Sequence, residues 1–276
     1  MIECDFQPGR AMPEPAELTD AQSDADEDDL KQALVGLAGI VVAALTVGEL
    51  LTQVARFAAQ AIPGVDGAGA TAAHPSWARS RIQAWAVAAE FLRDIETIQY
   101  EVHNEGPCIT AMQTGRPCIS GSIGDDSRWP RFGPAVARLG VHSALSLPLL
   151  LHEKVIGSIS TYAYSPDAFA EHAVTLGAKF ARPAAVSVHN ARTLMEAQHR
   201  VEQLQRALDG RSVVDQAIGI IRGQSGASTE DAFGRLVTIS QSENTKLHVL
   251  AERLVDQSVH RACARHEQAR PQPPRD

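Results

Sequence analysis

The sequence is poor in the features that define several large classes of protein. It has four cysteines in 276 residues, widely scattered and with no Cys-x-x-Cys pair. No secretory leader precedes them, and this cysteine usage favours a reducing cytoplasm. The apolar, uncharged stretch Ala33–Gly48 is shorter than the roughly 20 apolar residues that span a bilayer. We therefore expect a cytoplasmic protein that does not enter a membrane.

Motifs for metal binding and for catalysis are absent as well. None of the ten histidines forms a His-x-x-x-His pair or a cluster with cysteine. No Ser-His-Asp order, glycine-rich phosphate loop or kinase signature can be assembled from the sequence. We expect no metal site, no catalytic residue and no enzymatic activity.

The composition is that of an ordinary globular protein, with 44% hydrophobic and 21% charged residues. A chain of this length can form two modest domains that bury their own cores. Charge is unevenly distributed, because residues 1–30 carry a net charge of −9 and the other 246 residues therefore carry +1 of the total of −8. Acidic residues and proline with few large apolar side chains predict a disordered acidic tail over residues 1–30.

The hydrophobic pattern predicts an α+β domain after this tail. Helical spacing covers Leu34–Ile62, and the small residues Gly67–Ala73 with the apolar run Ile82–Ala88 suit a hairpin. The clearest strand signal is His142–Leu151, then a tight turn, then Val155–Tyr164. These segments predict one antiparallel sheet flanked by helices, with a further long helix from Phe169 onward.

Five short motifs lie in this region: Gln99-Tyr100, Glu105–Cys108, Asp126–Phe132, Gly140–Ser143 and Ser146–Leu149. Together they resemble the motifs of a GAF domain, most closely those of actinobacterial GAF-ANTAR regulators. The resemblance covers about residues 34–195, and the combination is far more specific than any single motif. It implies a GAF sensor domain, for which we take residues 31–195, and a small-molecule ligand in its pocket whose identity is unknown.

One enzymatic alternative concerns Cys108 and Cys118, because some GAF domains reduce free methionine sulfoxide with cysteines. Such chemistry needs a thiolate of lowered pKa and a partner within disulfide reach. Neither cysteine lies in the sequence surroundings that those reductases share, and free cysteines are common in protein cores. We expect structural cysteines.

An apolar stripe follows the GAF-like region. Its residues step by four and three, as in a coiled coil, although the same stripe would also suit packing within one chain. We favour a signalling helix that forms a homodimer. The residues of the expected seam are Leu194, Val201, Leu204 and Leu208.

Three helical segments can be read between Leu208 and Val255, and the second begins with an N-cap at Ser228. This all-α bundle resembles an ANTAR domain over about fifty residues, and we take residues 196–257 for it. The small residues Ala217, Gly219 and Ala232 would let helices approach closely. Residues that match the ANTAR pattern and are expected to build the fold are Ala217, Gly219, Ala232, Phe233, Leu247 and Ala251.

The resemblance implies that two such bundles in a dimer bind paired RNA hairpins in a nascent transcript, as an antiterminator, with no role for DNA. RNA binding requires basic groups for phosphate and polar groups for unpaired bases. The supply is thin, because residues 196–257 carry a net charge of −2, and relatives carry basic residues at or near Ile218, Thr238, Glu243 and His248. An interaction module that has lost RNA binding is therefore the alternative. We expect RNA contacts from Arg211, Arg222, Arg235, Asn244 and Lys246, and a disordered tail over residues 258–276.

Overall fold

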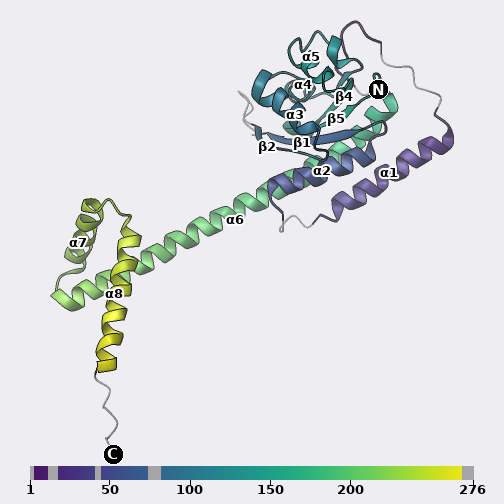
Figure 1. Cartoon of the computed structure of the whole chain (residues 1–276). Helices are drawn as coiled ribbons and strands as arrows, with labels where there is room; N and C mark the ends of the chain where they lie inside the picture. Colours follow the sequence, from purple (N-terminus) through teal and green to yellow (C-terminus); the bar gives the residue numbers. More distant parts are fainter. Residues whose placement is uncertain (1–2, 12–17, 41–44, 74–81, 269–276) are drawn as a thin grey trace, which may run out of the picture. The chain divides into compact units, whose positions relative to one another are not determined.

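The computed structural model describes residues 3–11, 18–40, 45–73 and 82–268, without the side chains of 202, 204, 206–210 and 265–268. It divides into two compact units, Met1–Met195 and Glu196–Asp276, whose elements are labelled in Figure 1. The N-terminal unit contains α1 (Asp20–Ala38), α2 (Val47–Ala61), β1 (Gly67–Ala73), β2 (Ile82–Val87), α3 (Leu92–Thr97), the π-helix η2 (Ile98–His103), α4 (Pro107–Thr114), β3 (Cys118–Ser120), the 3-10 helix η3 (Ile123–Asp125), α5 (Phe132–Ala137), β4 (Ser143–Leu151) and β5 (Lys154–Ala163). Helix α6 (Glu171–Ser225) runs from this unit into the next, where α7 (Thr229–Ser242) and α8 (Leu247–Gln268) follow.

The five strands form one antiparallel sheet in the order β2-β1-β5-β4-β3. The expected hairpins are confirmed: β1 pairs with β2, and β4 pairs with β5. Leu151 pairs with Lys154, so the connection between β4 and β5 has two residues, His152 and Glu153, both with positive φ. Two such residues between paired strands make the primed turn that matches the right-handed twist of a hairpin.

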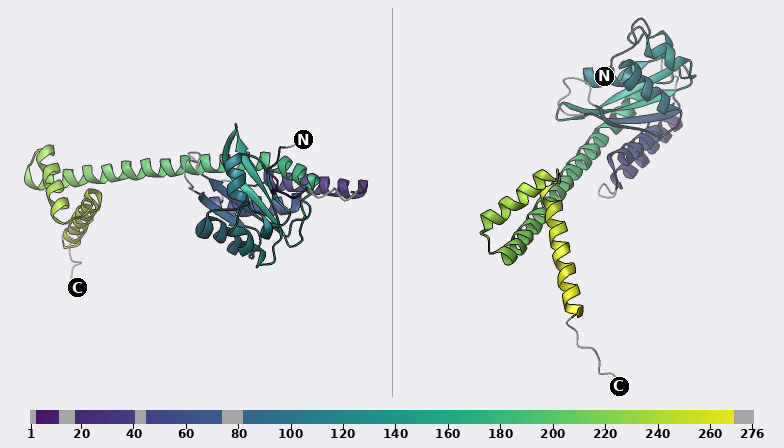
Figure 2. Two further views of the ribbon diagram at one scale, coloured as in Figure 1. Left: turned by 90° about the horizontal axis from the view of Figure 1, so that it is seen from above. Right: turned by 60° about the vertical axis from the view of Figure 1, so that its left-hand side comes forward.

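Helices cover both faces of the sheet (Figure 2). Two separate apolar cores are buried beneath them. The core on one face lies against α1, α2 and α6 and receives Leu145, Leu147 and Ile159. The core on the other face lies under α3, α4 and α5 and receives Ala144 and Tyr162. Residues of the two cores alternate along β4 and β5 because successive side chains of a strand point to opposite faces of the sheet.

The prediction of a disordered N-terminal tail is wrong for the residues that the structure describes. Asp5 forms a parallel bridge to Cys118 of β3, and Thr19 opens α1 with a capping box. Helix α1 then buries Leu30, Ala33 and Leu37. Two of its acids have partners on α6, because Asp26 lies 3.0 Å from His172 and Glu27 forms an ion pair of 3.4 Å with Lys179. The prediction from composition did not take account of the apolar face of α1 or of these partners.

The C-terminal unit is a small three-helix arrangement formed by the end of α6, α7 and α8. Its core contains small and branched side chains from all three helices, and Ser228 caps α7 as predicted. The predicted disordered tail is wrong for residues 258–268, because α8 continues to Gln268. No proline interrupts this segment before Pro271, and its alanine, arginine, glutamate and glutamine residues favour helix. The buried core residues are Ala217, Ile218, Ala232, Leu236, Leu250 and Ala251.

Candidate functional site

A buried network of polar side chains lies between the sheet and its α3–α4 layer. Glu96 of α3 accepts hydrogen bonds from Ser160 Oγ at 2.6 Å and from Gln99 Nε2 at 2.8 Å. Gln99 Oε1 in turn accepts from the backbone N–H of Cys108 at 3.0 Å. The Cys108 thiol lies 2.7 Å from Ser158 Oγ. The network therefore joins α3, η2, α4 and β5 through side chains that water does not reach.

The sheet makes room for this network with a row of small side chains in cross-strand register. Gly69 is paired with Ser160, Ser160 with Ser146, and Ser146 with Cys118. A Cβ atom on Gly69 would lie 2.7 Å from Glu96 Oε1, so any larger residue there requires the Glu96 carboxyl group to move. Within the part of the chain that the structure describes, the buried hydroxyls of Ser146 and Tyr162 have no hydrogen-bond partner. The layer thus holds unsatisfied donors and acceptors beside a carboxyl group.

Burial controls the protonation of the network. Desolvation raises the pKa of Glu96 to about 7, although Ser160 and Gln99 stabilise its ionised form. Burial raises the pKa of the Cys108 thiol to about 11, and the nearby Glu96 acts in the same direction. Burial also raises the pKa of the Tyr100 and Tyr162 hydroxyls. At neutral pH the thiol and the phenols are therefore neutral, and Glu96 is the group that titrates.

Cys118 belongs to a different set of contacts. Arg128 Nη1 donates to its sulfur at 3.4 Å, and the Arg128 guanidinium also holds Asp126 and lies 4.5 Å from the Trp129 ring centroid. Burial raises the pKa of the Cys118 thiol despite the charge of Arg128. Both Cys108 and Cys118 are free thiols. Neither meets the requirement of a reactive cysteine for an accessible thiolate.

The motif residues Glu105 and Asp126–Phe132 build the layer over the sheet and do not form a reactive centre. Glu105 accepts hydrogen bonds from the backbone N–H groups of Arg131 at 2.6 Å and Phe132 at 2.8 Å. Partial burial acts to raise the pKa of Glu105, but these hydrogen bonds lower it overall. Trp129 Nε1 donates to Thr110 Oγ1 at 3.0 Å and so ties the loop before α5 to α4.

A surface pocket of 460 Å³ opens beside the network and reaches it through Tyr100. It is lined by residues of β2 and η2, including Trp85 and Asn104. Tyr100 lies in its wall, and the Tyr100 hydroxyl is 2.9 Å from Thr71 Oγ1 on β1. The arrangement offers a small molecule an entrance and, behind Tyr100, the buried hydrogen-bonding groups.

The residues of this network were not predicted from the sequence. Gln99, Tyr100 and Ser146 had appeared only as parts of the GAF-like motifs, and Cys108 had been considered only as a redox cysteine. Glu96, Ser158 and Ser160 had not been singled out. The two serines alternate with apolar residues along a predicted strand, and this pattern could have indicated a polar face of the sheet. A single glutamate in a short helix gives no comparable indication.

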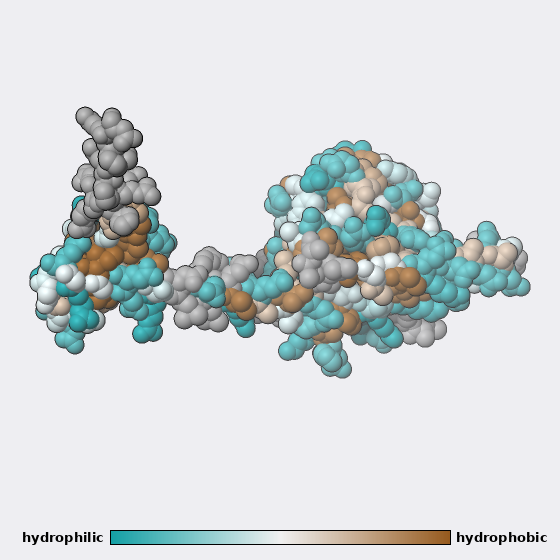
Figure 3. All heavy atoms as spheres, turned by 90° about the horizontal axis from the view of Figure 1, so that it is seen from below, coloured by the Kyte–Doolittle hydropathy of each residue, from teal (hydrophilic) through white to brown (hydrophobic). Residues whose placement is uncertain are grey.

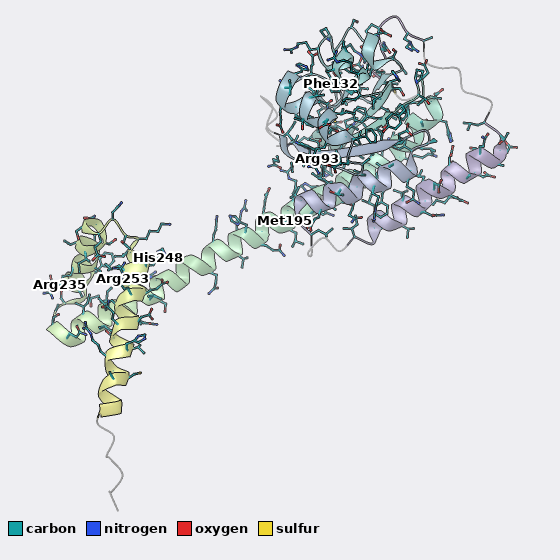
Figure 4. All side chains as sticks on the ribbon, in the orientation of Figure 1. Arg93, Phe132, Met195, Arg235, His248 and Arg253 are labelled. Atoms are coloured by element: carbon teal, nitrogen blue, oxygen red, sulfur yellow. The ribbon has the colours of Figure 1, made fainter. Side chains whose placement is uncertain are left out.

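The structure places the expected RNA contacts at the surface of the C-terminal unit. Arg211 and Arg222 lie on α6, and their separation of eleven residues puts them on the same side of that helix. Arg235 lies on α7, as Figure 4 shows. Asn244 occupies the turn before α8 with a φ of 48°, and Lys246 follows it. In the described part of the chain no ion pair involves Arg211, Arg222, Arg235 or Lys246, whereas Arg253 is 3.0 Å from Glu243.

The residues expected to build the bundle fall into two groups. Ala217, Ala232 and Ala251 are completely buried, and Leu247 is partly buried against them. Phe233 is 44% exposed and so lies outside the core. The reason given for Gly219 is wrong, because a Cβ atom there would meet nothing within 4 Å and no helix approaches it closely.

Ile218 is part of the core of the C-terminal unit and is only 7% exposed. Its apolar side chain therefore contributes to the packing of this core. The unit nevertheless presents apolar residues at its surface, which Figure 3 shows in brown. Ile239 and Val249, for example, are 39% and 38% exposed.

Comparison with known families agrees with this organisation. The GAF domain family matches residues 44–189, and the ANTAR domain family matches residues 202–255. The chain is thus a sensor-type regulatory protein with an RNA-binding type of output domain. It belongs to the GAF domain family and carries an ANTAR domain after the GAF domain, an architecture known for RNA-binding antitermination.

Similar solved structures include the GAF domain of a phosphoenolpyruvate-protein phosphotransferase from Coxiella burnetii, at 14% identity and a TM-score of 0.48, covering 63% of this chain and 98% of that one. Another is the free methionine-R-sulfoxide reductase from Neisseria meningitidis, at 13% identity and a TM-score of 0.46, covering 67% of this chain and 98% of that one. No curated protein matches the sequence significantly. None of the helices in the described ranges is long and apolar enough to cross a membrane.

Proposed function

We propose that the protein is a cytoplasmic antitermination regulator, in which the GAF domain senses a small ligand and the ANTAR domain binds hairpin RNA. The observation that carries this proposal is the ANTAR match over residues 202–255, together with exposed basic side chains on the same unit that form no ion pair with any described residue. Arg211 and Arg222 on one side of α6, with Arg235 and Lys246, supply cations for phosphate. Asn244 offers an amide to unpaired bases.

The active species is a homodimer formed along α6. Leu194 is 38% exposed and Val201 is 65% exposed, and they are seven residues apart on the same helical side. The side chains of Leu204 and Leu208, also expected in this seam, lie outside the described residues. A dimer presents two ANTAR bundles, and binding of the second hairpin then becomes intramolecular. Such pairing raises affinity by about 10² to 10⁴ without any new contact.

The ligand acts by favouring one state of the GAF domain over another. A ligand shifts an equilibrium only by its differential affinity for the two states. The buried network joins the sheet to α3, η2 and α4. A molecule that enters beside Tyr100 and replaces one hydrogen bond of the network therefore changes the free energy of the layer formed by these three helices. The response reaches α6 through the opposite face of the same sheet. There Leu147 and Ile159 belong to the core to which α6 also contributes.

A second candidate function is an interaction module without RNA binding. The ion pair between Arg253 and Glu243 favours it, because it removes one of the few cations of the unit from phosphate. No enzymatic activity is proposed, since the thiols of Cys108 and Cys118 are buried and their pKa values are raised.

The experiment that separates these functions is a gel-shift titration of the full chain with a two-hairpin RNA at several salt concentrations. RNA binding predicts an affinity that falls steeply with salt and weakens in Arg222→Gln combined with Arg235→Gln. Arg253→Gln is the matched control, because its charge is already paired, and should have the smaller effect. Duplex DNA of the same length should not compete. Undetectable binding to any hairpin RNA, with the dimer intact, would favour the interaction module.

A further inference from the structure

A second cavity of 460 Å³ lies on the N-terminal unit, along the edge of β4 and beside α6. Its apolar floor is formed by Leu147, Pro148 and Leu150 of β4 and by Ala178 and Ala181 of α6. Leu147 and Ala181 are almost fully buried. The volume is within the range of pockets that bind small molecules, which is about 300–1,000 Å³.

The cavity exists because the sheet is incomplete at this edge. The short strand β3 pairs only with residues Ala144–Ser146 of β4. Leu147–Leu151 therefore have a strand neighbour on the β5 side alone among the described residues. Pro148 suits such an edge, since it presents no N–H group that would need a partner. Alanines at 178 and 181 leave the space between this edge and α6 unfilled.

The rim of the cavity carries cations that suit a negatively charged group. Arg116 lies in the turn after α4, and Arg182 lies on α6 next to Ala181. Arg182 forms no ion pair in the part of the chain that the structure describes. Arg116 is held at 2.8 Å by the carboxylate of Glu3. Glu153 is the opposing acid on the rim.

Glu3 shows what kind of group the rim accepts. It reaches Arg116 because Asp5, two residues later, is paired with Cys118 through two backbone hydrogen bonds, of 2.7 Å to Pro117 and 3.0 Å from Ile119. The segment is further fixed by Gln7, whose amide oxygen accepts from the backbone N–H of Ser122 at 3.0 Å. The chain thus places its own carboxylate at the polar end of an apolar cavity. Both Glu3 and Arg116 are largely exposed, so this carboxylate can be replaced by another at small cost.

We propose that this cavity is a binding site for a small carboxylate with an aliphatic body, such as a short fatty acid. The aliphatic part lies on Leu147, Leu150 and Ala181, and the carboxylate replaces that of Glu3 on Arg116, with Arg182 alongside. The site is separate from the Glu96 network, which lies under the other face of the sheet. It does not depend on RNA binding, and three of its residues belong to α6, the last helix of the unit.

The test is a titration of the full chain with hexanoate, followed by NMR of the methyl groups of Ala178 and Leu147. Saturable shifts of these methyl resonances are expected. Hexanamide, which has a similar shape without the charge, should bind about two- to fivefold more weakly, as for loss of one exposed ion pair. Ala178→Phe fills the cavity and should abolish the shift of Leu147.

Two exposed residues should change hexanoate affinity in opposite directions. Arg116→Gln removes the cation and should weaken binding, whereas Glu3→Gln removes the competing carboxylate and should tighten it by about two- to fivefold. Arg138→Gln, at the end of α5 in the other layer, is the matched control and should change nothing. Neither of the first two changes alters a buried side chain, so they test the site even if Ala178→Phe does not fold. Absence of saturable binding, or equal affinity in the Arg116, Glu3 and control variants, would overturn the proposal.

Discussion

The buried carboxyl group of Glu96 predicts that the N-terminal unit loses stability as the pH rises through neutrality. Its pKa is about 7 in the folded protein, against an ordinary value of 4.5. The folded state therefore binds a proton that the unfolded state has already released between these values. For an acid whose pKa is raised on folding, the stabilisation is complete below pH 4.5 and is lost as the pH rises through 7.

The gap between the two pKa values corresponds to a loss of about 3 kcal/mol in the free energy of unfolding, of which about 2.5 kcal/mol falls between pH 5 and pH 8. Domains of this size are stable by only about 5–15 kcal/mol, so the effect is large enough to measure. Glu96→Gln removes the titrating group. The amide oxygen of the variant can accept from Gln99 Nε2, and its amide nitrogen can donate to Ser160 Oγ, because a serine hydroxyl both donates and accepts.

The assay is urea unfolding of the wild type and of Glu96→Gln at a series of pH values, followed by tryptophan fluorescence. All three tryptophans lie before residue 130, so this signal reports the N-terminal unit. The difference in unfolding free energy between wild type and variant should move by about 2.5 kcal/mol between pH 5 and pH 8. Glu101→Gln, an exposed glutamate of the same segment, is the control and should follow the wild type. A Glu96→Gln variant with the same pH dependence as the wild type would refute the reasoning.

Gly69→Ala places a Cβ atom 2.7 Å from Glu96 Oε1 and should lower the free energy of unfolding by about 1–3 kcal/mol in urea titrations; an unchanged midpoint would mean that the carboxyl group is free to move. Leu194→Glu with Val201→Glu should give monomers in sedimentation without unfolding the GAF core, whereas a persistent dimer would place the interface elsewhere. The purified protein should not reduce methionine sulfoxide with a thiol donor, and turnover that depends on Cys108 would contradict its assignment as structural.

The fold was largely predictable because its strongest signals are local. The hairpin of β4 and β5 and the N-cap Ser228 of α7 depend only on neighbouring residues, and the structure confirms them. The N-terminal segment was mispredicted because its order comes from distant partners. Gln7 is buried by backbone groups more than a hundred residues away, and Asp26 meets His172. Amino-acid composition cannot predict contacts between residues so far apart in the sequence.

The candidate sites were less predictable than the fold, for a related reason. The network around Glu96 depends on register between strands, since Gly69, Ser160 and Ser146 become neighbours only when three strands pair. The exposure of individual side chains was equally difficult to predict from the sequence. Phe233 matches the ANTAR pattern, yet the packing of α7 leaves it at the surface. The basic residues of the C-terminal unit were located from the sequence, but the pairing of Arg253 with Glu243 was not.

The turn between β4 and β5 stores conformational energy beside the second cavity. His152 and Glu153 have φ values of 46° and 65°, a left-handed backbone that side chains with a Cβ atom adopt at a cost of about 1–2 kcal/mol each. Asn-Gly is the sequence that forms this turn with little strain, and the chain has neither residue here. Both strained residues line the cavity floored by Leu147 and Ala181. The strained turn therefore makes the β4–β5 hairpin less stable than a hairpin with the same strands and an Asn-Gly turn. This strain is located at the cavity, because both turn residues line it.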